Sequence, residues 1–206
     1  MRRHQTANTR PSPGATGRRA AALSTLLLTL LTLALAPPAA ADTPARDKRA
    51  ARFEVAFMRE MIDHHEMGVH MAHPCIEKAL HADLRRLCRS IARVQAAEIK
   101  TMQKWLRDWY KIDHQPSTDH PGHHRDMETL ESLSGAKFEI AFLEMMIEHH
   151  LPAVEEGMEC LEEAEHAQLK RLCQGIVTSQ VREINQMQVW LCKWYKRCDF
   201  RDPLET

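Results

Sequence analysis

Hydrophobic positions recur at helical intervals along most of the chain, and one arrangement of these positions occurs twice. Residues 53–111 align without a gap to residues 138–196 at an offset of 85, and 29 of the 59 aligned positions are identical. An internal repeat of this kind indicates a supersecondary unit that cannot bury its apolar face alone. The pattern therefore predicts two similar helical units that pack on each other.

Each copy divides into two predicted helices. In the first copy, the apolar positions from Phe53 to Met71 have helical spacing, and we expect a break around His73 and Pro74 because proline disfavours helix in the preceding residue. The second half is a heptad seam with alternating steps of four and three. Its positions are Leu84, Cys88, Ile91, Gln95, Glu98, Met102, Trp105 and Trp109. Two such hairpins predict an all-α fold, a four-helix bundle.

We expect the two hairpins to form one domain joined by a crossing loop. The first hairpin is placed at residues 42–111 and the second at residues 136–206. The linker between them, residues 112–135, is rich in His, Pro and Ser, with a short helical lead-in expected at Met127–Leu133. The chain has only 7 Gly, which argues against a sandwich, a barrel or a glycine-rich nucleotide fold.

The first 41 residues are predicted to be a cleaved export signal. They contain five arginines and no acidic residue, followed by an apolar run at Ala20–Ala36 and small residues before Asp42. The run of about 17 residues is at the lower limit for crossing a bilayer, so an uncleaved anchor is the alternative. We expect a secreted, periplasmic or cell-envelope protein without stable membrane insertion after cleavage.

Charge and cysteine content narrow the function further. Without the first 41 residues, 23 Lys+Arg face 28 Asp+Glu, and the absence of a basic face argues against a nucleic-acid partner. An even number of cysteines in an exported chain favours disulfides over thiolate metal ligation. Two cysteines flank the turn of each hairpin and a third pair lies near the C-terminus. The expected bridges are Cys75–Cys88, Cys160–Cys173 and Cys192–Cys198.

Side chains that bind soft metals occupy positions expected to face the bundle. The first helix of each hairpin contains Met-x-x-His-His, and the second contains Gln-x-x-Glu-x-x-x-Met. Thioether and imidazole groups suit Cu(I), whereas imidazole and carboxylate suit Cu(II), and a buried carboxylate needs a partner, a proton or a metal. The predicted ligands are Met61, His64, His65, Glu98 and Met102 in the first copy and Met146, His149, His150, Glu183 and Met187 in the second. Copper is the predicted metal, with another divalent metal as the alternative.

The first copy and the linker contain further potential ligands that the second copy lacks. Possible additional ligands in the first copy are Met58, Met67, His70, Met71 and His73. In the second copy His73 is replaced by Met158, and the other four are replaced by residues other than Met and His. The linker adds His114, His120, His123, His124 and Met127. A histidine-rich segment of this kind is either a loose metal-binding tract or a solvated linker.

Two enzyme motifs are nearly present and neither is complete. His65-Glu66 begins like a zinc-protease helix, but the position of the second histidine holds Val69. Glu163-x-x-His166 fits one half of a carboxylate di-iron motif, but the other copy has Lys78 in place of the glutamate. No Ser-His-Asp set or phosphate loop is present. We therefore expect no catalytic residues and a protein that is not an enzyme.

The combined motif resembles a known family. FxxxFMxxMIxHH followed by HxxLxxLCxxIxxxQxxEIxxMxxWL is similar to the family of domain of unknown function 305, which includes CopM-like copper-binding proteins. The resemblance covers about residues 43–198 and implies a ferritin-like bundle, export and, for some members, copper binding through Met and His. It implies the same ten ligands as above. Glu66-Met67 and Leu151-Pro152 depart from the small or polar residues that often follow the His pair.

Three functions follow from these patterns. The leading hypothesis is an exported, non-catalytic protein that sequesters or buffers copper. The first alternative is a structural or protein-interaction bundle whose Met and His side chains only fill the core. The second alternative is a metal-dependent redox enzyme.

Overall fold

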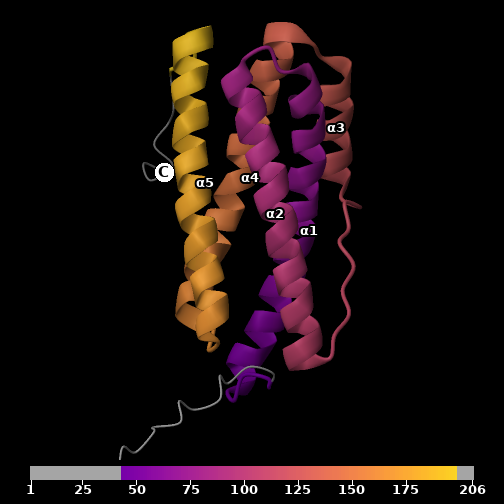
Figure 1. Ribbon diagram of the computed structural model, residues 1–206, viewed down its shortest axis with the longest axis vertical. Helices are drawn as coiled ribbons and strands as arrows, with labels where there is room; N and C mark the ends of the chain where they lie inside the picture. The colour runs from indigo at the N-terminus through magenta and orange to yellow at the C-terminus, as the bar shows by residue number, and fades with distance from the viewer. Residues whose placement is uncertain (1–42, 199–206) are drawn as a thin grey trace, which may run out of the picture. The chain divides into compact units, whose positions relative to one another are not determined.

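The computed structural model describes residues 43–198, and over this range the chain forms five α-helices and no strand. The helices are α1 (Lys48–Lys78), α2 (Ala82–Tyr110), α3 (Pro121–Ser132), α4 (Gly135–Glu163) and α5 (Ala167–Tyr195). In Figure 1, α1 and α2 form one hairpin and α4 and α5 form the second. The predicted all-α fold is confirmed. The predicted export signal at residues 1–41 lies outside the described residues.

The hairpins pack on each other through their first helices, α1 and α4. One buried cluster combines Cys75 and Leu84 at the turn of the first hairpin with Phe138 and Phe142 at the start of α4. The other combines residues of the opposite ends, from the start of α1 and the turn of the second hairpin. The helices α1 and α4 therefore run antiparallel, so that the turn of each hairpin packs against the open end of the other.

The break expected at His73 and Pro74 is wrong, because α1 continues through Pro74 to Lys78. A proline inside a helix lacks one N–H donor and crowds the preceding turn. Here Cys75, the next residue, is fully buried and bonded to α2, so packing outweighs the local preference. The helix α4 likewise contains Pro152.

The linker contains a longer helix than the expected lead-in at Met127–Leu133. The helix α3 starts at Pro121, a position where proline's missing N–H is no loss, and the side chain of His120 caps it by accepting a hydrogen bond from the N–H of Gly122. The buried residues Met127 and Leu130 attach α3 to the core. This helix packs on α1 and α4.

The heptad seam predicted for α2 is correct at most positions and shifts at two. Glu98 and Trp105 are half-buried, whereas the neighbouring Ile99 and Leu106 are buried. An α-helix has 3.6 residues per turn, so a strict seam of 3.5 drifts away from the buried face over several turns. Glu98 therefore lies at the edge of the contact between helices rather than at its centre.

Candidate metal centre

The first histidine of each pair meets its counterpart where α1 packs against α4. The rings of His64 and His149 stack with centroids 3.9 Å apart and planes 11° from parallel. His64 Nε2 also donates a hydrogen bond of 2.9 Å to the backbone carbonyl of His149. The predicted ligand sets of the two halves are thus joined across the contact between the hairpins.

The second histidine of each pair bonds to a carboxylate on the second helix of its own hairpin. His65 Nε2 lies 2.9 Å from Glu98 Oε2, and His150 Nε2 lies 2.9 Å from Glu183 Oε2. Both imidazoles are fully buried, and the carboxylate side chains are 18% and 12% exposed. Because an ionised carboxylate only accepts hydrogen bonds, each Nε2 carries a proton, and in the neutral form of the ring Nδ1 then keeps a lone pair.

Six buried side-chain atoms of the histidine pairs and two glutamines have no hydrogen-bond partner within residues 43–198. They are His64 Nδ1, His65 Nδ1, Gln95 Oε1, His149 Nε2, His150 Nδ1 and Gln180 Oε1. A buried polar atom left without a partner costs about 1–3 kcal/mol. A group of such atoms indicates a bound cation or ordered water.

Two of these atoms approach the same point on α1. A methyl group built at Gly68 would lie 2.3 Å from Gln95 Oε1 and 2.9 Å from His149 Nε2. These atoms come from α2 and α4, so the glycine makes room for side chains of both hairpins. The equivalent position in the second copy is Ala153, which means that the two halves of the histidine cluster are not identical.

We call His64, His65, His149 and His150 the histidine cluster. Burial, together with the positive charge that His65 would carry, lowers the pKa of His64 to about 3. Burial and the neighbouring His64 lower the pKa of His149 well below its usual value. Both rings are therefore neutral at physiological pH, which is the form that binds metals.

The predicted methionine ligands are all fully buried, and they divide between the two core clusters. Met61 and Met102 lie in one cluster, together with Met58. Met146 and Met187 lie in the other, together with Met71. Each pair has one methionine on the first helix of a hairpin and one on the second helix. The methionine on the first helix lies one turn before the histidine pair, and the methionine on the second helix lies one turn after the glutamate.

The carboxylates and imidazoles alone do not form a complete metal site. Among the described residues, no group of three His, Cys, Asp or Glu side chains is placed to hold a metal ion. Glu98 and Glu183, which are predicted as ligands, are hydrogen-bonded through Oε2 to His65 and His150. A metal at the cluster would need thioether or amide donors in addition to imidazole.

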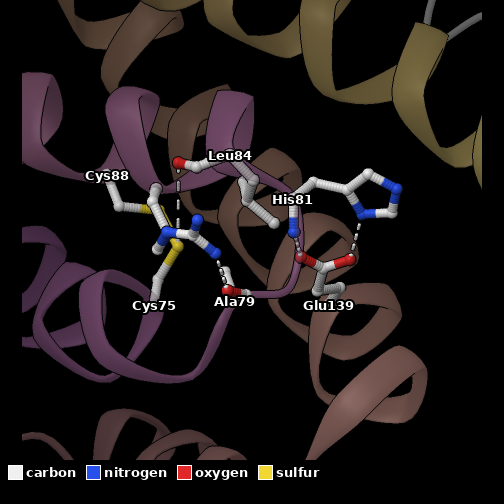
Figure 2. Close-up of a disulfide and its surroundings, with 7 residues drawn as sticks. Cys75, Ala79, His81, Leu84, Cys88 and Glu139 are labelled. Atoms are coloured by element: carbon white, nitrogen blue, oxygen red, sulfur yellow. Dashed lines mark hydrogen bonds and ion pairs between the residues drawn. A yellow bond between two sulfur atoms is a disulfide. The ribbon is translucent and has the colours of Figure 1, made fainter.

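Two buried hydrogen-bond networks, each made of a Glu, a His and a Tyr, connect the hairpins and were not predicted from the sequence. Glu139 at the start of α4 is fully buried and accepts hydrogen bonds from the backbone N–H of His81 at 2.8 Å, from His81 Nδ1 at 2.6 Å and from the hydroxyl of Tyr195. Figure 2 shows His81 and Glu139 facing each other beside the Cys75–Cys88 bridge. The ring of His81 also stacks on Trp194 with centroids 3.8 Å apart.

The equivalent residues of the other copy form the same arrangement. Glu54 accepts from the backbone N–H and the Nδ1 of His166 and from the hydroxyl of Tyr110. In this arrangement too, the glutamate and tyrosine belong to one hairpin and the histidine to the other. The available signal was the recurrence of Glu, His and Tyr at an offset of 85.

The three expected disulfides are confirmed. The bridges Cys75–Cys88 and Cys160–Cys173 close the two hairpins, each with a sequence separation of 13, and Cys192–Cys198 closes the end of α5. No described cysteine is free. The cysteines are therefore not available as thiolate ligands.

The additional histidines of the first copy and the linker have different surroundings. His70 on α1 lies next to His123 on α3, whereas His73 is exposed. His114 Nε2 and the backbone N–H of Ser117 both donate to Asp63 Oδ1 at 2.9 Å, which holds the linker against α1. One linker histidine thus has a structural role.

The molecule defined by this fold and site is a helical protein of two disulfide-closed hairpins with buried histidines at their contact. None of the helices in the described range is long and apolar enough to cross a membrane. The chain belongs to the family described as Domain of unknown function (DUF305), whose model matches residues 54–191. The predicted family is therefore confirmed.

Several solved structures are similar to this chain. CopM in the Cu(I)-bound form is 31% identical, with a TM-score of 0.62, over 69% of this chain and 97% of that chain. CopM in the Cu(II)-bound form has the same identity and coverage and a TM-score of 0.63. A DUF305 protein from Streptomyces coelicolor, inferred to be secreted, is 29% identical over 68% of this chain and 93% of that chain, with a TM-score of 0.60. No protein of curated function matches the chain.

Proposed function

We propose that this protein is an exported copper-binding protein that sequesters or buffers the metal without catalysis. The observation that carries the proposal is the histidine cluster, in which four imidazole nitrogens are buried without a hydrogen-bond partner. Side-chain packing by itself leaves all four of these nitrogens without a partner. A soft cation would satisfy them and recover the free energy lost on burial.

The second histidine of each pair supplies the best-defined donor. Histidines that bind metals usually donate their other ring N–H to a carboxylate or carbonyl, which fixes the orientation of the ring. Glu98 does this for His65 and Glu183 does it for His150, both at 2.9 Å. The role proposed for the glutamates is therefore to orient the imidazoles, with Nδ1 of each histidine facing the metal.

Buried methionines favour Cu(I) as the form that is held. Thioether and neutral imidazole groups are soft to borderline ligands, and the neighbouring Glu98 and Glu183 each use one carboxylate oxygen, Oε2, to bind a histidine. The proposed ligands beside the histidine cluster are the thioethers of Met61, Met102, Met146 and Met187. Their burial would keep Cu(I) away from water and oxidants, as a storage role requires.

The similar structures support this assignment. CopM has been solved with Cu(I), Cu(II) and Ag bound, and the similarity covers 69% of this chain and 97% of CopM. Export is supported by the three disulfides, which persist in oxidising compartments, and by the signal pattern in residues 1–41.

An anaerobic Cu(I) titration against a chromophoric chelator tests the proposal. We expect His65→Ala combined with His150→Ala to lower the Cu(I) affinity by about tenfold or more. Met61→Leu conserves volume, so it should lower Cu(I) affinity and leave the fold intact. The matched control is His124→Ala, since His124 is exposed and its ring contacts Asp119 instead. Equal Cu(I) affinity in all four proteins would contradict the proposal.

The second candidate is a structural or interaction bundle with no metal role. It is favoured by the absence, among residues 43–198, of three converging His, Cys, Asp or Glu side chains. In that case ordered water would satisfy the histidine cluster. The same titration separates the two candidates. If the protein is only a structural bundle, the unchanged protein should bind Cu(I) no more tightly than the variant that lacks His65 and His150.

A further inference from the structure

Basic side chains form one row along the outer face of α2. No basic face was expected from the overall charge, because that sum averages the cations of α2 with the acidic residues of the other helices. With about 3.6 residues per turn, the row occupies a sector of about 80° and extends over roughly 32 Å of the helix. We call it the basic row, and its members are all exposed: Arg86, Arg89, Arg93, Lys100, Lys104 and Arg107.

The charge of the basic row is only partly neutralised by the protein itself. Arg86 forms an ion pair with Asp83, and Lys104 forms one with Asp108, both within α2. The other four cations of the row have no carboxylate partner within residues 43–198. Exposed ion pairs are weak and exchange readily with other partners. The row therefore presents a net positive charge to its surroundings.

The second copy shows that the hairpin does not need these cations in order to fold. The helix α5 has the same place in its hairpin as α2 and is closed by the equivalent disulfide. Its residues at the positions of the basic row are Arg171, Gln174, Thr178, Asn185, Val189 and Cys192. Only the first of these keeps a charge. The basic row is therefore specific to α2 and is not a requirement of the repeated unit.

Acidic side chains are concentrated on a different helix. The exposed residues of α4 include Glu148, Glu155, Glu159 and Glu162, which lie within a sector of about 60°. Among the described residues, no ion pair joins this acidic row to the basic row of α2. Separated charges of opposite sign orient a molecule in an electric field. An anionic surface would thus attract α2 and repel α4.

We propose that the basic row docks the protein on the surface of an anionic phospholipid bilayer, without insertion. A straight row of cations on one helix face can meet a plane of phosphate groups with all its members at once, and each cation adds about fivefold to binding. The aromatic residues of α2 are half-buried or buried, so they offer no platform for stacked nucleic-acid bases. The other exposed residues, Ala82, Asp83 and Ala97, provide no large apolar side chain for insertion into lipid. The signal pattern in residues 1–41 predicts that the chain is carried to a membrane during export.

The test is cosedimentation of residues 42–206 with vesicles, at about 0.1 M salt. This part of the chain omits the arginines of residues 1–41 and contains the five described helices and the three disulfides; the similar CopM structure, 97% of which is covered, comprises little more. Vesicles of phosphatidylglycerol and phosphatidylcholine should bind the protein, whereas vesicles of phosphatidylcholine alone should not. Salt at about 1 M should release it, because the screening length falls to about 3 Å.

The deciding variant gives four cations of the basic row the residues that α5 has at the same positions. Its substitutions are Arg89→Gln, Arg93→Thr, Lys100→Asn and Lys104→Val. Binding to the anionic vesicles should weaken by about 100-fold or more. A matched control loses the same charge from exposed positions on other helices and should bind nearly as the unchanged protein does. Its substitutions are Arg52→Gln, Lys137→Gln, Arg171→Gln and Arg182→Gln.

Circular dichroism checks the fold; if the fourfold variant of α2 unfolds, Arg93→Thr combined with Lys100→Asn decides, with an expected loss of about 20-fold. Equal binding to the two kinds of vesicle would overturn the proposal, as would an equal loss in the two fourfold variants. So would self-association of the vesicle-free protein that the α2 substitutions abolish, which would make a second copy the partner. Equal binding of duplex DNA at the same phosphate concentration would also overturn it. Cu(I) affinity should be unchanged in the α2 variant, so the result is independent of the proposed storage function.

Discussion

Replacement of Gly68 by alanine is the sharpest probe of how the histidine cluster is packed. The new methyl group would lie 2.3 Å from Gln95 Oε1 and 2.9 Å from His149 Nε2, distances at which neither atom can stay in place. Both atoms are at the ends of side chains, but Gln95 is only 3% exposed and the His149 ring is stacked on His64. The amide and the ring must therefore move together.

Two opposing effects set the magnitude. Alanine favours a helix over glycine by about 0.5–1 kcal/mol, and Gly68 lies inside α1. Overpacking a well-filled interior costs about 1–3 kcal/mol. The net expectation is a loss of about 1 kcal/mol in the free energy of unfolding, together with weaker Cu(I) binding because His149 is displaced.

Gly175 provides the matched control. It lies inside α5, and a methyl group there would have no atom within 4 Å, so Gly175→Ala should stabilise the protein by about 0.5–1 kcal/mol. Urea unfolding of the metal-free protein measures both variants, and the two should differ by about 2 kcal/mol. Equal stabilisation by both substitutions would refute the packing described for Gln95 and His149.

Three other predictions follow from the same structure. Because the folded pKa of His64 is about 3 and its usual value is 6.5, its contribution is fully present above pH 6.5 and is lost as the pH falls. His64 alone should make the metal-free protein about 2 kcal/mol less stable at pH 5 than at pH 7.5. In urea unfolding, His64→Gln should therefore reduce the pH dependence, while His149, whose pKa is also lowered by burial, keeps part of it. Reduction of the Cys75–Cys88 bridge should lower stability by roughly 3 kcal/mol, and mass spectrometry of the non-reduced protein should recover this pair. Glu139→Gln should lower the free energy of unfolding by about 2 kcal/mol, because it removes the charge from a buried acceptor of three hydrogen bonds. Glu131→Gln is the control, since Glu131 is exposed and its replacement should change the stability little. Equal midpoints of urea unfolding for these two variants would contradict the role assigned to Glu139.

The hairpins and their disulfides could be predicted from the sequence because their determinants are local. The periodicity of the apolar positions fixes which face of each helix is buried, and cysteines on either side of a turn are close whatever the hairpins do next. The break at Pro74 was predicted wrongly because the local preference was outweighed by burial of Cys75. Glu98 lies off the predicted seam because a 3.5-residue spacing drifts away from the buried face of a helix with 3.6 residues per turn.

The parts that could not be predicted depend on how one hairpin lies on the other. The stack of His64 on His149 requires α1 and α4 to run antiparallel in one register, which no pattern within a single copy specifies. The bonds of Glu139 to His81 likewise join two hairpins, and a glutamate at the start of a helix otherwise indicates a solvated surface. The contact of His70 with His123 needed the helix α3, which was predicted as a shorter segment.

Histidine nitrogen NMR with Ag(I), a diamagnetic analogue of Cu(I), tests the central claim most directly. In protein labelled with ¹⁵N-histidine, the account predicts that Ag(I) shifts the Nδ1 resonances of His65 and His150, because these lone pairs are free for a metal. Their Nε2 resonances should stay protonated through the bonds to Glu98 and Glu183. Unchanged Nδ1 resonances in the presence of Ag(I), or metal-induced shifts at Nε2 instead, would contradict copper binding by the histidine cluster as described.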